Sequence, residues 1–232
     1  MKKLIVAAAF MLMGLSASAQ LQVGGGYKYE FWPVKVKESR GWNRQGTFEM
    51  HGIYAGASYN WAMTDFGLSL TPGAYFSLVS GVSSTKNEKT GKMEKTRYST
   101  ELERVRSGNR SLMLTIPVYV TYSMPIGPGD AFVYGGPSLE CGITLKDYER
   151  GRQRETASSP WRSFKELSQN YYSDGIDMRP FDFKMGVGFG YRWEFIQVNL
   201  GMDIGMVNRA PKSNAYASYH AHSIHFGAAY IF

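Results

Sequence analysis

Residues 181–207 read FDFKMGVGFGYRWEFIQVNLGMDIGMV, and this stretch decides the fold class. Apolar or aromatic residues occupy every second position from Phe181 to Trp193, and the pattern repeats from Ile196 to Met206. Successive side chains of a β-strand point to opposite faces, so a period of two predicts two strands. A link of about two residues predicts a hairpin turn between them. The intervening residues are glycine, amide or charged, which predicts one apolar face and one polar face.

The same alternation marks eight strands in all. They are expected at 21–31, 48–61, 66–82, 111–123, 131–146, 181–193, 196–207 and 220–232. The connections alternate between long and short, and the long ones are 32–47, 83–110, 148–179 and 208–219. Long loops at one end and tight turns at the other are typical of outer-membrane barrels. The expected fold is therefore all-β: an eight-stranded antiparallel up-and-down transmembrane β-barrel with long extracellular loops.

The N-terminal residues predict export from the cytoplasm. A basic start, an apolar run at 4–15 and small residues after it are typical of a signal peptide over 1–19, cleaved between Ala19 and Gln20. Residues 20–232 are then expected to form one barrel domain in a bacterial outer membrane. An even number of strands places both termini on the periplasmic side.

The polar face of the strands predicts a charge network inside the barrel. An eight-stranded barrel is just wide enough for side chains to fill, and buried charges must be paired. The residues expected in this network are Lys28, Glu30, Glu140, Asp182, Lys184, Arg192 and Asp203. Lys184 and Arg192 are expected to lie beside Asp203. Mixed signs favour a salt-bridged plug, and a conducting lumen or a proton path is the alternative.

Three further positions carry expectations about the outward face. Leu145 continues the apolar face of the fifth strand, so it is expected to face lipid. Trp32 and Phe48 lie near the outer ends of their strands, where an aromatic girdle is expected at the membrane interface.

The charge of the chain also differs between the strands and the long connections. The formal net charge is +7, and the four long connections hold 20 Lys and Arg against 10 Asp and Glu. A basic protein often binds nucleic acid, but these basic residues would face lipopolysaccharide outside the cell. Contact with phosphate there is the simpler interpretation, and no nucleic acid is expected. Solvated loops without a specific partner explain the charge equally well.

The histidines of the last strand suggest an enzyme as the alternative function. His220 and His222 share the outward face near the outer rim, with His225 further along the strand. Outer-membrane lipid A deacylases are eight-stranded barrels with a lipid-facing Ser/His/Glu site. Ser223, however, points to the opposite face from those two histidines, which separates nucleophile from base. Two imidazoles without a third ligand are a weak metal signal. We therefore expect no catalytic, cofactor or metal site, and keep a lipid A-modifying esterase as the alternative.

The third long connection contains a possible helix over 160–171. Ser159 would be the N-cap and Pro160 the first helical residue. The residues that would then share one face are Trp161, Phe164, Leu167 and Tyr171. Such an amphipathic helix could cover the barrel mouth, lie on the lipid surface, meet a partner or pack on its own loops.

Three stretches together resemble a known family. Residues 114–122, LTIPVYVTY, resemble the L-x-I-P strand of outer-membrane β-barrel proteins common in Bacteroidetes, a group that includes PorT-like proteins. Residues 72–77, PGAYFS, resemble the third-strand motif of that family. Residues 226–232, FGAAYIF, resemble a barrel assembly signal with Phe226, Tyr230 and the terminal Phe232. The resemblance implies insertion by the barrel assembly machinery. It also implies an envelope or extracellular partner, since PorT itself is associated with protein secretion.

Overall fold

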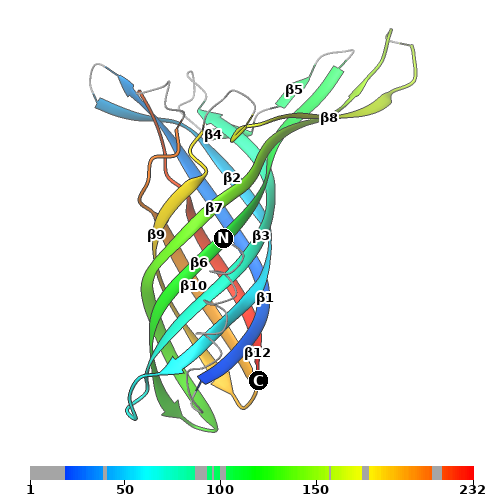
Figure 1. The fold of residues 1–232 in the computed structure, drawn as a ribbon. Coiled ribbons are helices and arrows are strands. Elements are labelled where there is room, and N and C mark those ends of the chain that lie inside the picture. The colour runs from blue at the N-terminus through cyan, green and yellow to red at the C-terminus, as the bar shows by residue number, and fades with distance from the viewer. Residues whose placement is uncertain are drawn as a thin grey trace, which may run out of the picture.

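The computed structural model describes residues 19–38, 41–86, 93–95, 97–99, 103–156, 158–173, 178–210 and 216–232. These residues form a closed antiparallel barrel with the axis vertical in Figure 1. The expected signal peptide lies almost wholly outside the described residues, which begin at Ala19. None of the described residues forms a helix long and apolar enough to cross a membrane.

Eight long strands make up the wall. They are β1 (Ala19–Glu38), β2 (Gly41–Ala62), β3 (Leu68–Lys86), β6 (Glu103–Ile126), β7 (Gly129–Gln153), β9 (Phe181–Trp193), β10 (Ile196–Gly205) and β12 (His222–Ile231). Neighbours in sequence are neighbours in space, β12 pairs with β1, and β3 pairs with β6. The ring is therefore an up-and-down barrel of eight strands, as the alternation in the sequence predicts. Four short strands lie beyond one end: β4 (Met93–Lys95), β5 (Arg97–Ser99), β8 (Arg162–Asn170) and β11 (Ala217–Tyr219).

The β9–β10 hairpin confirms the sequence reading of residues 181–207. Trp193 pairs with Ile196, so the turn consists of Glu194 and Phe195, and Glu194 adopts a left-handed φ of 50°. The strand ends at Gly205, two residues earlier than expected. Burial alternates along both strands, with the apolar residues exposed on the outside.

Glycines on the inner face of β9 leave room for large rings from β7. A Cβ at Gly188 would lie 2.3 Å from the ring of Tyr134, and one at Gly190 would lie 2.4 Å from the ring of Phe132. Larger residues at these two positions would push the rings away. The small residues between the apolar ones therefore allow an aromatic lumen, while the outside carries the apolar belt that a lipid contact requires.

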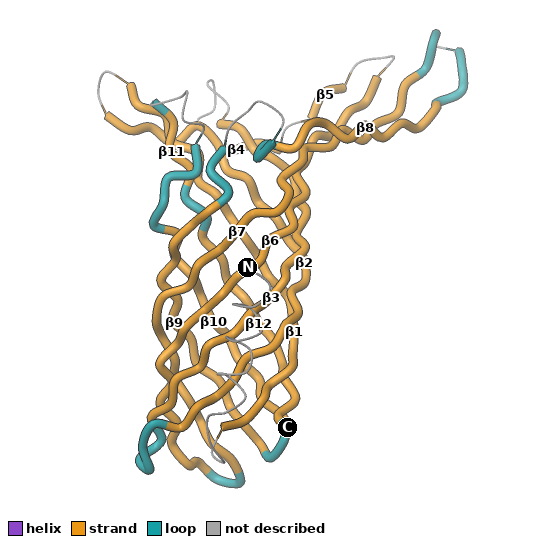
Figure 2. The backbone as a smooth tube through the Cα atoms, in the orientation of Figure 1, coloured by secondary structure: helices purple, strands orange, loops and turns teal. Residues whose placement is uncertain are grey.

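β1, β2, β6 and β7 are longer than the sequence predicts, because parts of the long connections beside them are themselves β-structure. β1 and β2 pair out to Glu38 and Gly41, and β6 and β7 pair out to Glu103 and Gln153. Beyond the rim, β6, β7 and β8 lean away from the barrel axis, as Figures 1 and 2 show. The possible helix over 160–171 is wrong: residues 162–170 form β8, which pairs with β7. The backbone hydrogen bonds offered by the edge of β7 replace those of a helix.

Three outward assignments are also wrong. β7 has a bulge at Ile143. Met113 of β6 pairs with Gly142 and the adjacent Leu112 pairs with Thr144, so Ile143 between them is an extra residue. This bulge reverses the alternation, so Leu145 faces inward and is 4% exposed. Trp32 is fully buried, and Phe48 packs on it edge to face rather than joining a girdle at the rim.

Candidate functional site

A layer of paired charges crosses the middle of the lumen. Glu140 is fully buried at its centre, with its Oε2 atom 3.0 Å from Lys28 Nζ and 2.8 Å from Lys184 Nζ. Glu30 lies 3.3 Å from Lys28 and 3.8 Å from Lys184, and accepts a 2.7 Å hydrogen bond from Trp32 Nε1. These four charged residues were all expected in the lumen. Each carboxylate contacts both lysines, so the charges of this layer are paired within the protein.

A third cation, Arg209, enters this layer from the connection after β10. Its Nη1 atom donates to Glu140 Oε1 at 3.0 Å, and Nη2 donates to the Tyr172 hydroxyl at 2.7 Å. Further bonds reach the carbonyl oxygens of Arg179 and Pro180, and the guanidinium lies 4.6 Å from the centre of the Trp32 ring. Burial alone would lower the pKa of Arg209, but the neighbouring Tyr172, Glu140, Glu30 and Asp182 raise it above its usual value. Arg209 therefore ties the outer connections to the barrel interior as a permanent cation.

An apolar cluster closes the lumen beyond the charge layer, on the side of the long connections. Its members are Trp32, Met50, Val79, Met113, Leu145, Met178 and Ala221, all buried. On each strand these residues lie nearer the long connections than the charged residues do. Burial of such a cluster excludes water from that end of the barrel.

The remaining predicted charges lie apart from this layer. Asp182 pairs in register with Glu140 and accepts a 3.0 Å bond from the backbone NH of Val207. Arg192 lies near the short turns, where its guanidinium covers the Phe132 ring and donates to Gln197. The expected contact of Asp203 with Lys184 and Arg192 is therefore wrong. Lys184 pairs with Glu30 and Glu140, and Arg192 contacts Phe132 and Gln197 at the end of its strand.

Asp203 instead belongs to a hydroxyl and imidazole network. Its Oδ1 atom accepts from Tyr119 Oη at 2.9 Å, and its Oδ2 atom accepts from Ser223 Oγ at 3.0 Å. His225 Nδ1 lies 3.4 Å from the same Oδ2 atom, and His225 Nε2 bonds to Tyr134 Oη at 3.0 Å. The carboxylate is thus partnered by Tyr119 of β6 and by Ser223 and His225 of β12.

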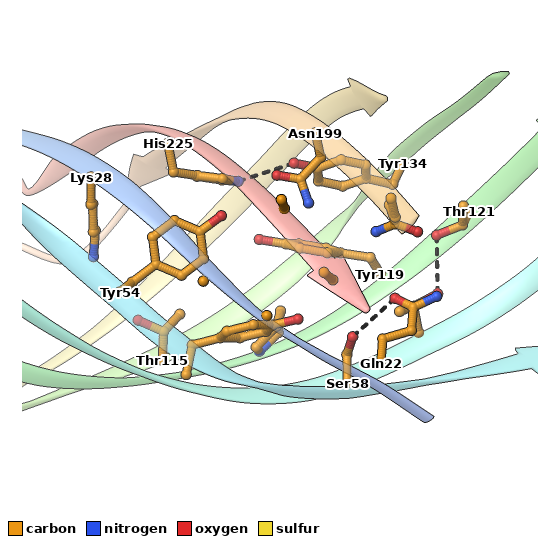
Figure 3. Close-up of a pocket in the computed structure, with 18 of the residues that line it drawn as sticks. Gln22, Lys28, Tyr54, Ser58, Thr115, Tyr119, Thr121, Tyr134, Asn199 and His225 are labelled. Carbon is orange, nitrogen blue, oxygen red and sulfur yellow. Dashed lines mark hydrogen bonds between the residues drawn. The ribbon is translucent and has the colours of Figure 1, made fainter. Parts of the chain in front are cut away.

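A cavity of about 100 Å³ lies between this network and the short turns (Figure 3). Its walls include the rings of Tyr54, Tyr75, Tyr119, Tyr134 and Phe132. Asn199 Oδ1 is buried there without a hydrogen-bond partner among the described residues. A cavity of this size and polarity holds several water molecules, which would satisfy that oxygen.

The histidines considered for an enzyme lie where the sequence places them. His220 and His222 stack with ring centres 6.5 Å apart, and His222 lies 5.3 Å from the ring of Phe31. Ser223 is fully buried on the opposite face and bonded to Asp203. Within the described part of the chain, no group of three or more His, Cys, Asp or Glu is arranged to hold a metal.

The sheet beyond the rim sorts its charges by face. Arg106 of β6 stands opposite Arg97 of β5 and Arg150 of β7, and Arg150 stands opposite Lys165 of β8. Arg104 opposes Arg152, and Arg110 opposes Lys146. Paired residues share a face and residues two apart in a strand do too. By backbone register, the positions on one face, called the basic face here, therefore include Arg97, Arg104, Arg106, Arg110, Lys146, Arg150, Arg152 and Lys165, with no acidic residue among the described positions.

The opposite face of the same sheet has the reverse character. Its charged positions are Glu103, Asp147, Glu149, Arg162 and Glu166. Sequence reasoning found the excess of basic residues in the long connections but not this separation, because it treated those connections as loops without faces. The signal was present in the spacing of Arg104, Arg106, Arg150 and Arg152.

The C-terminal residues close the ring at the short-turn end. Phe232 donates its backbone NH to Leu21 at 2.9 Å, and the rings of Tyr230 and Phe232 lie 4.8 Å apart on the outside. Phe226 is also exposed there. Their use as an assembly signal stays a prediction.

Comparisons with known proteins find one family and several solved structures to which this chain is similar. A profile of the family described as outer membrane protein beta-barrel domain matches residues 4–232. The attachment invasion locus protein Ail of Yersinia pestis is similar in structure, with 10% identity and a TM-score of 0.35 over 93% of this chain and 99% of that one. Neisserial surface protein A has 11% identity and a TM-score of 0.37 over 92% and 99%. The outer-membrane protease OmpT of Escherichia coli has 8% identity and a TM-score of 0.32 over 94% and 99%.

No curated protein matches the chain in sequence. The family match nevertheless spans nearly every residue, and the described fold is the closed barrel that the family name states. The chain belongs to the outer membrane protein beta-barrel domain family.

Proposed function

We propose that this protein is a non-enzymatic outer-membrane barrel that binds an anionic partner outside the cell through the basic face of its outer sheet. In this proposal the signal peptide is removed, both termini lie in the periplasm, and the long connections face the exterior. The observation that carries the proposal is the separation of charge: eight basic positions on one face and four acidic ones against a single arginine on the other.

The energetics of the sheet support a binding role. Like charges directly opposite each other in neighbouring strands are destabilising, by roughly 0.2–1 kcal/mol per pair. Arg97, Arg106, Arg150 and Lys165 form an uninterrupted row of such pairs. An anion that spans the row removes this repulsion and gains charge-assisted hydrogen bonds. Binding an anion and ordering the sheet are therefore favourable together.

The filled lumen supports this proposal over the alternative of a conducting channel. In this proposal the buried charge layer and the apolar cluster have a structural role, and the outer surface meets the partner. The resemblance of residues 72–77 and 114–122 to PorT-like proteins of Bacteroidetes suggests a narrower form, in which the partner is a component or a cargo of a secretion system.

Binding to immobilised dextran sulfate tests the proposal. The variant carries Arg104→Gln, Arg106→Gln, Arg150→Gln and Arg152→Gln, and the control carries Lys35→Gln, Lys37→Gln, Arg154→Gln and Arg162→Gln, all outside the basic face. Both lose four positive charges. We expect the purified wild type and the control to elute at similar salt, and the basic-face variant to elute at clearly lower salt. Equal elution of the two variants would refute a face-specific site.

The non-enzymatic part needs a separate measurement. The lipid A mass spectrum is expected to be identical in cells with and without the protein. Loss of an acyl chain that depends on His222 would instead establish the lipid A-modifying enzyme.

A further inference from the structure

We infer that the lumen contains a second binding site, in the cavity on the short-turn side of the charge layer. Its ligand is a small, uncharged molecule with a flat apolar ring and one hydroxyl group. This site is separate from the basic face, so it does not depend on the proposed function. Three features of the cavity point to this ligand: the rings that form its walls, the pairing of the charges around it, and two polar atoms that lack partners.

Aromatic side chains from four neighbouring strands form the walls of the cavity. Tyr54 of β2 and Tyr75 of β3 meet edge to face, with ring centres 5.9 Å apart. Tyr119 of β6 and Tyr134 of β7 lie 5.0 Å apart. Figure 3 shows Tyr54, Tyr119 and Tyr134 projecting into one space from different strands. Because aromatic rings pack best in tilted or edge-to-face arrangements, walls of this kind favour a flat ring as the occupant.

Glycines of the neighbouring strands let these rings lie along the barrel wall. Tyr54 extends across β1 to β12, where a Cβ at Gly227 would lie 2.0 Å from its hydroxyl oxygen. Tyr134 extends across β9 to β10, where a Cβ at Gly201 would lie 2.2 Å from its hydroxyl oxygen. The rings therefore cover the wall, and the middle of the lumen at this level stays unfilled.

The charges that face the cavity are already paired, which favours an uncharged ligand. Lys28 contacts both glutamates of the charge layer. Asp203 has its partners in the hydroxyl and imidazole network. Arg192 donates to Gln197 and stands opposite Asp130 in register. A charged molecule would lose its hydration in this space, and no unpaired charge on the described walls would replace it.

Two buried polar atoms of the lining have no hydrogen-bond partner among the described residues. They are the acceptor Oδ1 of Asn199 and the donor Nε of Arg192. Arg192 pairs in register with Gln197, and Asn199 is two residues further along the same face of β10, so the two side chains are neighbours. A hydroxyl group both donates and accepts a hydrogen bond, as water does. A ligand that displaces water from here must replace its hydrogen bonds, and one hydroxyl group does so.

The volume of the cavity limits the ligand to a single ring. The cavity measures about 100 Å³. An engineered apolar cavity of roughly 150 Å³ binds benzene. A ring with one hydroxyl group, as in phenol, is therefore close to the upper limit, and a sugar ring or a lipid chain is too large.

The experiment measures binding of para-fluorophenol to the full barrel in nanodiscs, by the broadening of the ligand's fluorine NMR signal. Fluorobenzene, which lacks the hydroxyl group, is the comparison ligand, and discs without protein correct for partition into lipid. Ala229→Leu places a larger side chain in the cavity from the inner face of β12. The matched control, Ala74→Leu, adds the same side chain at an exposed position on the outside of β3. Asn199→Leu keeps a side chain of similar volume and removes the acceptor.

We expect fluorophenol to bind to the wild type and to Ala74→Leu, and not to Ala229→Leu. The heat-modifiable shift on a gel shows whether each variant is folded. Asn199→Leu should weaken fluorophenol binding about two- to ten-fold, which corresponds to one hydrogen bond, and leave fluorobenzene binding unchanged. This variant decides the outcome if Ala229→Leu does not fold.

Three results would overturn the inference. If fluorophenol does not bind to the wild type, the cavity holds water only. If it binds equally to the wild type and to folded Ala229→Leu, the ligand lies outside the cavity. If Asn199→Leu affects the two ligands equally, the hydroxyl group is not recognised. Binding to dextran sulfate should be the same in all these variants, so the proposed function is tested separately.

Discussion

The lumen and the outer sheet both contain clusters of charged residues, yet they arrange them in opposite ways. In the central layer of the lumen, Glu140 is surrounded by Lys28, Lys184 and Arg209 at 2.8–3.0 Å, so each charge of this layer has a partner of opposite sign. In the sheet, Arg106 stands between Arg97 and Arg150, so charges of the same sign are neighbours in register. The first arrangement satisfies itself and stabilises the barrel. In the proposed function an anion from outside neutralises the second, which is why we assign anion binding to the sheet and a structural role to the charge layer.

Neutralising the centre of the lumen should have the largest effect on stability. Glu140→Gln leaves Lys28, Lys184 and Arg209 together without their shared carboxylate. Breaking a buried ion pair by removing one partner costs about 3–5 kcal/mol. We expect a clearly lower unfolding temperature in detergent, followed by the heat-modifiable shift on a gel. The control is Glu149→Gln, an exposed glutamate of the same strand, which should change the free energy of unfolding by less than about 0.5 kcal/mol.

Removing Arg209 should have the next largest effect. Arg209→Ala deletes the bonds to Glu140 and Tyr172 and to the carbonyl oxygens of Arg179 and Pro180. Hydrogen bonds to charged groups contribute about 1.5–3 kcal/mol, so we expect a loss of about 2–3 kcal/mol. The outer connections should also loosen, so planar bilayers should show larger currents than the small, erratic ones expected of wild type. The control is Arg179→Ala, whose exposed side chain is lost while its carbonyl oxygen remains. Equal currents for both variants would mean that the apolar cluster alone closes the barrel.

These two residues also show what the sequence can and cannot predict. Glu140 was identifiable because β7 crosses the membrane region, where apolar and polar faces must alternate. Arg209 lies in a connection with no periodic pattern, so nothing in the sequence indicates that it returns to the lumen. Leu145 was misassigned because a single extra residue reverses the alternation, and the bulge has no sequence signal of its own. Both failures have one cause. The place of a side chain in the fold depends on contacts with distant parts of the chain, and the local sequence pattern does not contain these contacts.

The outer sheet was missed for a related reason. Outside the membrane both faces of a strand are wet, so the alternation of apolar with polar residues that marks a strand is absent from residues 103–109. At 160–171, the three- and four-residue spacing of apolar side chains fits a helix, but the free edge of β7 draws the segment into a strand. Tertiary pairing overrides a weak local preference of this kind.

Removing a charge from the hydroxyl network of the lumen should lower the stability less than removing one from the ion-paired layer. Asp203→Asn keeps the size of the side chain and removes its charge, while the side chains of Tyr119, Ser223 and His225 can rotate in response. We expect a loss of about 1–2 kcal/mol, measured by urea unfolding in lipid vesicles. Asp65→Asn in an exposed turn is the control. A loss as large as that of Glu140→Gln would show that Asp203 is coupled to Lys28 or Lys184 after all.

Neutralising one arginine of the outer sheet should have the smallest effect on stability, and this effect should be stabilising. Arg106 has a like charge on each side, and each such pair costs roughly 0.2–1 kcal/mol, so Arg106→Gln should stabilise the local sheet slightly. The measurement is amide hydrogen exchange of β6 and β7 beyond the rim, which should slow a few-fold in the variant at low salt. High salt should slow exchange in the wild type and reduce the difference, because it screens repulsion between exposed charges. Dextran sulfate should do the same for the wild type, by supplying the missing counter-charge. The control is Arg162→Gln, which removes the same charge from the same sheet at a position opposite the neutral Gln153, where the exposed side chain lies 3.6 Å from Glu155. Faster exchange in Arg106→Gln without added anion would mean that the row is already compensated within the protein. The contrast with the lumen would then disappear, and with it the physical reason for placing the binding site on this sheet.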